Sequence, residues 1–385
     1  MVHRARTTQL GPYRLRLETN SIATAGRWTN LLAGLPDGDP AAPTIDIAIA
    51  NERLQFTALV DNDEVYRGAD SFALEIAVTR RLNERKLDAE PHLVHLHSAA
   101  VAAGGLAVLI VGRSGQGKST LAARLVERGW QYVTDEQVTI RPSDRMVIPY
   151  ARPITLRRAV WRQFRTVQGS DDGDESRRVE VPLSDLGGTA QRSAVRPAVV
   201  IAPQYDPSAH NELSPIESRS ELVRLLASCC YDLERTGPLG MDVLVEVANR
   251  CPAWRLPFSD LDAAADAVAA ALEQSMGHAV PGQRMIPTSG VGQRLGPLRR
   301  RDGVTVWQFG DSSGLAFDHL RLRFVNLDPL GVAVWEMLGS AASAAELVAA
   351  APSHATRTAV EQWIEGLLGL GLLERFAGPH GRLSG

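Results

Sequence analysis

Eight consecutive residues have the types and spacing needed to bind a nucleoside triphosphate. Gly112-Arg-Ser-Gly-Gln-Gly117-Lys118-Ser119 fits the pattern G-x-x-x-x-G-K-[ST] without a mismatch. Glycines let backbone N–H groups turn inward around phosphate oxygens, and the helix that follows directs its positive end at the same anion. The residues expected to contact the nucleotide are Gly112, Ser114, Gly115, Gly117, Lys118, Ser119 and Thr120.

This motif predicts ATP and Mg²⁺ as cofactors. Lys118 is expected to neutralise the β- and γ-phosphates, and the Ser119 hydroxyl is expected to ligate Mg²⁺. An apolar strand precedes the motif and an amphipathic helix follows it, which is the context that phosphate binding requires. The alternative is a vestigial loop that keeps the turn without binding nucleotide.

Phosphoryl transfer also needs groups near the acceptor and the metal. Asp135-Glu136 ends the strand after the loop helix, so Asp135 is a candidate base or metal ligand and Glu136 a candidate Mg²⁺ ligand. His97, on the strand before the loop strand, is a candidate partner for Asp135. Arg152 and Arg157 are candidates for stabilising transferred charge. The plainer interpretations are a solvated turn, a core histidine and surface arginines.

The surrounding pattern predicts an α/β domain that positions these residues. Residues 93–101, 106–111 and 131–140 are typical of strands, and 121–129 of a helix that ends at Gly129. The predicted domains are an N-terminal β-rich region (1–91), a nucleotide-binding domain (92–275), a linker (276–296) and a C-terminal module (297–378). Residues 168–178 are charged and turn-rich, so they predict a mobile surface loop.

Composition excludes several classes of protein. The 385 residues carry a formal net charge of −3, which gives no support to nucleic-acid binding. Three cysteines (Cys229, Cys230, Cys251) without a C-x-x-C pair favour a reducing compartment over disulfides or zinc. The N-terminus lacks a signal-peptide pattern, and the apolar run 106–111 is too short to cross a bilayer. We therefore expect a cytoplasmic protein without a membrane partner.

The segment LHSAAVAAGGLAVLIVGRSGQGKSTLAARLVERGWQYVTDE resembles the catalytic core of HPr kinase/phosphorylase and its kinase-like relatives. The resemblance implies a P-loop fold of the HPr kinase/PEP carboxykinase type, with Asp135 as general base and His97 near it. It also implies serine phosphorylation with ATP, and a homo-oligomer, because the HPr kinase relatives form hexamers. Glu136 departs from the Asp-Asp pair of the bacterial enzymes, and the signature of the phosphorylase reaction has no clear counterpart here.

The C-terminal module resembles PqqD-like peptide-recognition domains through FVNLDPLGVAVWEML, AAELVAA and AVEQWIEGLLGLGLLE. The resemblance implies an α+β winged helix, three strands followed by helices at about 329–338, 344–350 and 356–368. Such domains bind the leader of a ribosomally synthesised precursor peptide by strand addition. The expected contact residues are Val304, Val306, Phe309, Leu315, Trp363 and Leu367. A winged-helix DNA binder is the alternative, disfavoured because the predicted recognition helix has almost no basic residue.

Two functions fit this combination. The first is a kinase that phosphorylates a serine or threonine of the precursor peptide. The second is a non-catalytic scaffold that presents the peptide to other modifying enzymes of its pathway.

Overall fold

The computed structural model describes residues 1–5, 7–53, 55–164, 174–275, 285–286, 298–338, 347–349 and 356–375. Its contacts divide the chain into two compact units. The first comprises Met1–Glu217, Leu225–Asp232 and Cys251–His278, and the second comprises Ser218–Arg224, Leu233–Arg250 and Ala279–Gly385. No helix in the described ranges is long and apolar enough to span a membrane.

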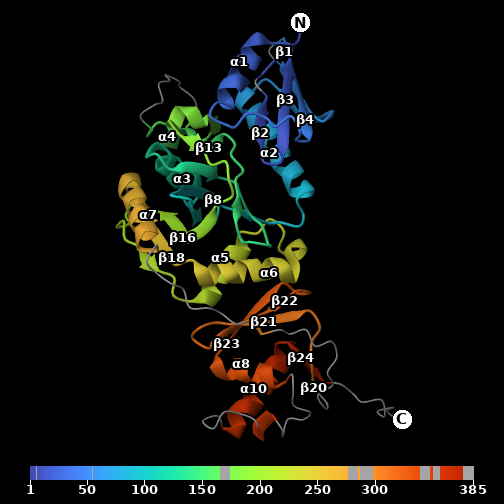
Figure 1. Cartoon of the computed structure of the whole chain (residues 1–385), viewed down its shortest axis with the longest axis vertical. Coiled ribbons are helices and arrows are strands. Elements are labelled where there is room, and N and C mark those ends of the chain that lie inside the picture. Colours follow the sequence, from blue (N-terminus) through green and yellow to red (C-terminus); the bar gives the residue numbers. More distant parts are fainter. Residues whose placement is uncertain are drawn as a thin grey trace, which may run out of the picture. The chain divides into compact units, whose positions relative to one another are not determined.

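Residues 1–89 form a β-sheet with two helices (Figure 1, blue). The sheet has the order β1-β3-β4-β5-β6, with β2 beside β3, and β3 and β4 run parallel. In β4 the alternate residues Ile45, Ile47 and Ile49 are buried, as expected of a strand with one face on the core. The elements are β1 (His3–Arg4), β2 (Thr8–Leu10), β3 (Tyr13–Thr19), α1 (Ile22–Leu31), β4 (Thr44–Glu52), β5 (Gln55–Val60), β6 (Asp63–Gly68) and α2 (Ser71–Ala89).

A seven-stranded sheet in the order β15-β10-β8-β9-β16-β18-β17 forms the centre of the first unit. Strands β9, β16 and β18 are parallel, and β9 is almost wholly buried, which explains its continuous apolar sequence. The strands are β8 (Ala99–Ala103), β9 (Leu106–Ile110), β10 (Gln131–Thr134), β15 (Thr189–Ala190), β16 (Arg196–Tyr205), β17 (Ser214–Pro215) and β18 (Ala253–Phe258).

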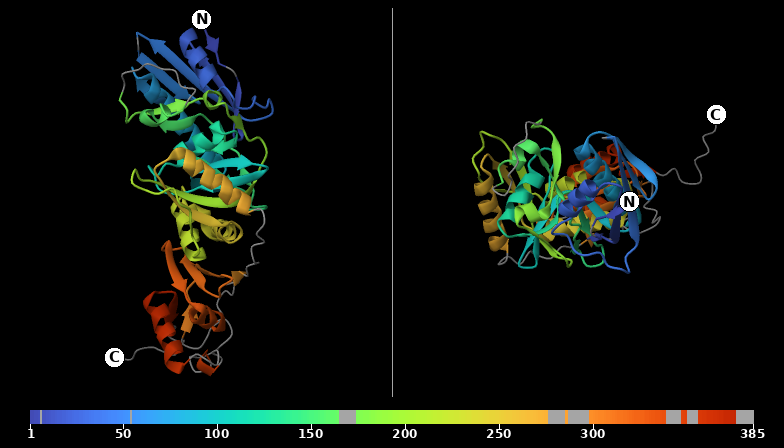
Figure 2. Two further views of the ribbon diagram at one scale, coloured as in Figure 1. Left: turned by 90° about the vertical axis from the view of Figure 1, so that its left-hand side faces the viewer. Right: turned by 90° about the horizontal axis from the view of Figure 1, so that it is seen from above.

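Helices α3 (Lys118–Glu127) and α7 (Leu261–Ser275) lie side by side against this sheet, and Figure 2 shows α7 crossing its strands. The Asp260 side chain caps α7 by accepting from the Ala263 N–H at 2.8 Å. The two flanking sheets are β12-β11-β7 and β13-β14. The remaining elements are β7 (Val94–His97), β11 (Gln137–Ile140), β12 (Val147–Ile148), β13 (Ile154–Arg157), α4 (Arg158–Trp161), β14 (Arg178–Val181) and η1 (Leu183–Leu186).

Two stretches expected to be single strands each divide between two sheets. The chain leaves β7 at Ser98 and enters β8, and it leaves β10 at Asp135-Glu136 and enters β11. The Ser98 N–H donates to the Glu136 carbonyl at 3.1 Å, which joins the two breaks. Both ends of each stretch are apolar, so periodicity alone could not reveal the break. The acidic pair and His97 consequently lie where the two sheets separate.

The second unit contains the sheet β19-β21-β22-β23 and the pair β20-β24. The three expected strands are present, followed by α8 and α10, while most of the expected helix at 344–350 lies outside the described residues. The elements are β19 (Met285–Ile286), β20 (Leu298–Arg300), β21 (Val304–Gln308), β22 (Gly314–Asp318), β23 (Arg323–Leu327), α8 (Pro329–Met337), α10 (Arg357–Gly369) and β24 (Leu373–Arg375).

Helix α6 (Leu233–Arg250) and the start of α5 (Arg219–Ser228) belong to the second unit, not to a domain ending at residue 275 as expected. The Trp307 indole N–H donates to Asp242 of α6 at 2.8 Å, and Arg224 donates to Asn326 of β23 at 2.7 Å. Sequence reasoning missed α6 because Gly237, at φ 58°, and Pro238 interrupt it.

Candidate active site

The glycine-rich loop joins β9 to α3 through backbone conformations that favour glycine. Gly112, Gly115 and Gly117 have φ angles of 139°, 86° and 93°. A Cβ at Gly117 would lie 2.8 Å from the Phe258 ring, so a side chain has no room there. Helix α3 begins at Lys118 without a side-chain cap, which leaves its first N–H groups available to a ligand.

Lys118 is buried inside this loop, with 6% of its surface exposed. Its Nζ donates to the carbonyls of Gly112 at 2.8 Å and Arg113 at 3.1 Å. Burial lowers the pKa of Lys118, against the raising effect of Cys229, Glu136 and Asp135. The Gln116 side chain accepts from the Arg113 N–H at 2.6 Å, which stabilises the same turn.

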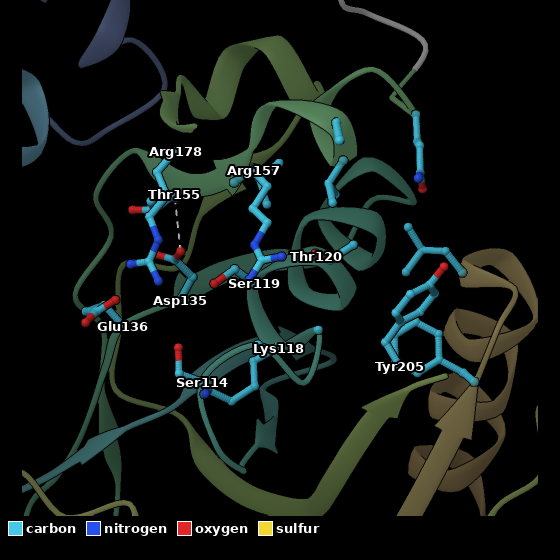
Figure 3. Close-up of a pocket in the computed structure, with 18 of the residues that line it drawn as sticks. Ser114, Lys118, Ser119, Thr120, Asp135, Glu136, Thr155, Arg157, Arg178 and Tyr205 are labelled. Atoms are coloured by element: carbon cyan, nitrogen blue, oxygen red, sulfur yellow. Dashed lines mark hydrogen bonds between the residues drawn. The ribbon is translucent and has the colours of Figure 1, made fainter. Parts of the chain in front are cut away.

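A cavity of about 410 Å³ opens beside the loop (Figure 3). This volume is typical of small-molecule sites. The expected nucleotide residues line it, apart from Gly112, whose carbonyl accepts from Lys118. Asp135, Glu136 and His97 also line it, so the structure brings the candidate catalytic residues to one place.

Two arginines on the facing hairpin point into the cavity. Arg157 of β13 and Arg178 of β14 are paired across the two strands, and Figure 3 shows Arg157 reaching toward Ser119 and Arg178 toward the acidic pair. Neither guanidinium has a side-chain partner in the described part of the chain. Sequence reasoning missed Arg178 because it ends the charged run 168–178, expected to be a loop. Its place in β14 is a correction to that expectation, and residues 165–173 lie outside the described ranges.

Asp135 is buried and both of its oxygens are engaged. Oδ1 accepts from the Tyr132 hydroxyl at 2.7 Å and pairs with Arg152 at 3.0 Å, and Oδ2 accepts from the Thr155 N–H at 3.1 Å. Burial raises the pKa of Asp135, and Arg152 opposes the rise. A carboxyl with a raised pKa is suited to accepting a proton, although it must first exchange one of these hydrogen bonds.

Glu136, not Asp135, is the partner of His97. The His97 Nδ1 lies 3.1 Å from Glu136 Oε1, and the Tyr231 hydroxyl donates to the same oxygen at 3.1 Å. Burial tends to raise the pKa of Glu136, but the hydrogen bond with His97 and the charge of Arg152 outweigh it and lower the pKa to about 2. Glu136 is therefore an ionised carboxylate at neutral pH. The expected pairing of His97 with Asp135 is corrected, because the break between β10 and β11 turns Glu136 toward β7.

Arg152 neutralises this acidic cluster and does not line the cavity. It is buried and pairs with Asp135, with Glu136 at 3.4 Å and with Glu180 at 3.5 Å. Arg152 is therefore no longer a candidate for stabilising transferred charge, whereas Arg157 and Arg178, which line the cavity, are candidates. Glu180 and Tyr231 were missed, because each is distant in sequence from its partners and no local pattern marks it.

Glu180 predicts a specific pH dependence of stability. Burial raises its pKa to about 8 from an ordinary value of 4.5. Between pH 4.5 and about 8 the carboxyl is ionised in the unfolded chain but still protonated in the folded one, so folding stability falls as the pH rises through this range. We expect the melting temperature of Glu180→Gln to exceed that of the wild type by roughly 3–5 °C more at pH 8 than at pH 5. An unchanged difference between the two pH values contradicts the assignment.

Tyr205 is a candidate platform for the nucleotide base. Its ring is 54% exposed, lines the cavity and makes an edge contact with Phe258 at 5.6 Å between centroids. Its N–H donates to the Gln116 carbonyl at 3.3 Å, which ties it to the loop. Figure 3 places it on the side of the cavity away from Glu136 and Arg178, so triphosphate and base would occupy opposite sides.

We expect Tyr205→Ala to weaken Mg-ATP binding about tenfold, because base–aromatic stacking contributes roughly 1–3 kcal/mol. Binding of inorganic tripolyphosphate should not change, since it has no base, and Tyr205→Phe should bind ATP like the wild type. Calorimetric titration with both ligands measures this. Equal losses for ATP and tripolyphosphate would show that Tyr205 acts on the loop instead.

Comparison with known proteins relates the residues around the cavity to one protein family. The family described as HPr Serine kinase C-terminal domain matches residues 91–158, which include the glycine-rich loop, His97 and the acidic pair. This region is therefore similar to the C-terminal domain of HPr serine kinases.

Individual relatives agree over the same part of the chain. The HPr kinase/phosphorylase of Clostridium botulinum (strain Eklund 17B / Type B) is 43% identical over 61 residues, covering 16% of this chain and 20% of that protein. That of Listeria monocytogenes serotype 4a (strain HCC23) is 33% identical over 116 residues, covering 30% of this chain and 31% of that protein. The chain thus spans less than a third of the length of these curated relatives.

The expected peptide-binding residues are mostly buried, which corrects their assignment as a contact surface. Val304, Val306 and Leu367 belong to the core of the second unit. Phe309 and Leu315 are also buried, and Trp363 packs over Gly331. The backbone edge of β21 is paired with β19, at Met285↔Trp307 and Ile286↔Val306. In the expected groove, β19 therefore already pairs with the β21 edge at Val306 and Trp307.

Proposed function

We propose that this chain is an ATP-dependent kinase that phosphorylates a serine or threonine of a ribosomally synthesised precursor peptide. The observation that carries the proposal is the convergence of Lys118, Ser119, Glu136, Arg157 and Arg178 on one cavity. Positioning and charge neutralisation account for most of phosphoryl-transfer catalysis, and these residues supply both.

Each residue has a role in the proposed reaction. The glycine-rich loop and Lys118 hold the β- and γ-phosphates, while Arg157 and Arg178 neutralise charge on the transferred group. The acceptor hydroxyl attacks the γ-phosphorus, the bond to the β–γ bridging oxygen breaks, and Asp135 accepts the hydroxyl proton. ADP leaves and a phosphate ester remains on the peptide. Tyr132 and Arg152 orient Asp135.

The donor set beside the loop fits Mg²⁺. The Ser119 hydroxyl and the ionised Glu136 carboxylate are hard oxygen ligands lining the same cavity, and Mg²⁺ in such sites uses few protein ligands plus phosphate oxygens. When bound, the ion would supply charge neutralisation at the phosphates. His97 and Tyr231 would hold Glu136 in place for it.

The second unit is proposed to recognise the leader of the precursor peptide. The strands-then-helices order supports this role, as does the resemblance of 324–338 to PqqD-like domains. Since β19 already pairs with part of the β21 edge, we propose strand addition at β23, the terminal strand at the other side of this sheet. The backbone amides of 323–327 that point away from β22 should then become protected from hydrogen exchange when the leader binds.

The decisive experiment mixes the purified 385-residue chain, Mg-ATP and a candidate precursor peptide. Mass spectrometry should find one added phosphate on a serine or threonine. Lys118→Ala serves as the inactive control. Binding of ATP and peptide without any phosphopeptide would contradict the kinase function.

A non-catalytic scaffold is the second candidate. It is favoured by one observation, that both oxygens of Asp135 already accept hydrogen bonds. In that case the chain presents the peptide to other modifying enzymes, and Asp135→Asn leaves maturation of the peptide unchanged wherever the variant folds.

A further inference from the structure

A second cavity of about 370 Å³ lies between helix α2 and strand β14 in the first unit. One side is a face of α2 whose residues recur at helical spacing, Ala73, Ile76, Ala77 and Arg80. The other side is Arg177 and Arg178. We call this cavity the α2 groove.

Four charged residues line the α2 groove, and two of them, Asp70 and Arg177, are paired with each other. Asp70 caps α2 by accepting from the Phe72 N–H at 2.9 Å, and it is ion-paired with Arg177. Arg177 also stacks on the Phe72 ring, 4.7 Å from its centroid. Arg80 and Arg178 are exposed and have no side-chain partner among the described residues. The groove therefore offers an apolar floor together with the exposed guanidinium group of Arg80.

Arg178 joins the α2 groove to the active-site cavity, because it lines both. A chain seated in the groove would place its neighbouring residue beside Arg178, which reaches toward the acidic pair in Figure 3. The site that aligns a peptide hydroxyl with a bound phosphate must adjoin the phosphate site, and the α2 groove shares Arg178 with it.

We propose that the α2 groove binds the acceptor segment of the peptide substrate, with an apolar side chain on Ala73, Ile76 and Ala77 and a carboxylate on Arg80. Carboxylates form strong paired hydrogen bonds with guanidinium groups, which gives both affinity and register. The inference rests on the proposed kinase function and adds a substrate class: acceptor segments with a carboxylate and an apolar residue near the phosphorylated hydroxyl.

Binding tests this directly, without phosphotransfer. Three fluorescein-labelled peptides share one sequence that contains a single serine and a leucine. They differ at two positions, which are aspartate in the first peptide, asparagine in the second and lysine in the third. All are amidated at the C-terminus. Fluorescence anisotropy is measured with the full chain, Mg²⁺ and a non-hydrolysable ATP analogue. An asparagine peptide with a free C-terminus tests whether the bound carboxylate is terminal or from a side chain.

We expect the aspartate peptide to bind about tenfold more tightly than the amidated asparagine peptide, the scale of one charge-assisted hydrogen bond. Arg80→Glu should remove this preference and favour the lysine peptide, while its affinity for the ATP analogue stays unchanged. Arg192→Glu is the matched control, because Arg192 is an exposed arginine that lines neither cavity. It should bind all peptides like the wild type.

Two results would overturn the proposal. One is equal effects of Arg80→Glu and Arg192→Glu. The other is that the aspartate peptide binds only after Asp171, Asp172 and Asp174 are replaced by asparagine. That result would mean that these acidic residues of the chain itself, and not a peptide, occupy the α2 groove. Failure of the kinase function appears differently, as peptide binding with normal charge preference but no phosphate transfer from ATP.

Discussion

Replacing Lys118 by alanine is expected to reduce Mg-ATP affinity by about a hundredfold, or roughly 3 kcal/mol. The ammonium group is held inside the loop by two carbonyls, so its position is fixed before a phosphate arrives. Its positive charge acts where water is largely excluded, which strengthens the attraction to phosphate oxygens. Phosphotransfer should fall at least as much as binding.

The same variant should not be less stable than the wild type in the absence of nucleotide. Burial disfavours the charged form of Lys118, so removing it relieves an unfavourable interaction. Calorimetric titration with Mg-ATP and thermal melting, run together with Arg192→Ala, separate binding from folding. A Lys118→Ala protein that binds ATP within about threefold of the wild type contradicts the nucleotide site.

Asp135→Asn and Glu136→Gln are expected to fail in different ways. Asparagine at 135 leaves the buried Arg152 with less counter-charge, which should cost roughly 3 kcal/mol or more of folding stability. If Asp135 is the base, transfer by the folded fraction should fall by about 10²–10⁴-fold. The Glu136 side chain is partly exposed, so Glu136→Gln should reduce folding stability less than Asp135→Asn does. It should instead raise the Mg²⁺ concentration needed for half-maximal transfer, because Glu136 is the proposed metal ligand.

Thermal melting, Mg²⁺ titration and initial rates on folded protein distinguish these outcomes, and Ser184→Ala, at a position outside the cavity, is the control. If Asp135→Asn transfers phosphate normally while Glu136→Gln does not, Glu136 is the base. If neither substitution changes transfer, the acidic pair is structural and the assigned chemistry is wrong.

Local patterns were sufficient for much of the fold and for the centre of the site. The glycine-rich motif lies between β9 and α3 as expected, because an apolar run, a fixed motif and a helical period are each legible within a few residues. His97 and the acidic pair line the same cavity, also as expected.

The missed features depend on residues distant in sequence. Arg178 faces Arg157 only because β13 and β14 pair, and Tyr231 reaches Glu136 across 95 positions. The breaks at Ser98 and Asp135-Glu136 do not alter the apolar pattern on either side. Likewise, β19 covers the edge of β21 with two residues, too few to show a strand period. No single-sequence pattern encodes such pairings.

The membership of α6 in the second unit affects how this chain can be divided. Residues 276–296 have the composition of a linker, yet a protein expressed from residue 297 would lack Asp242, the acceptor for the Trp307 indole, and Arg224, the donor to Asn326. A protein that begins after the linker would therefore contain only part of the second unit. The α6 helix leads into β18, whose last residue packs on Gly117 of the loop. Point substitutions are therefore safer probes of the second unit than truncations.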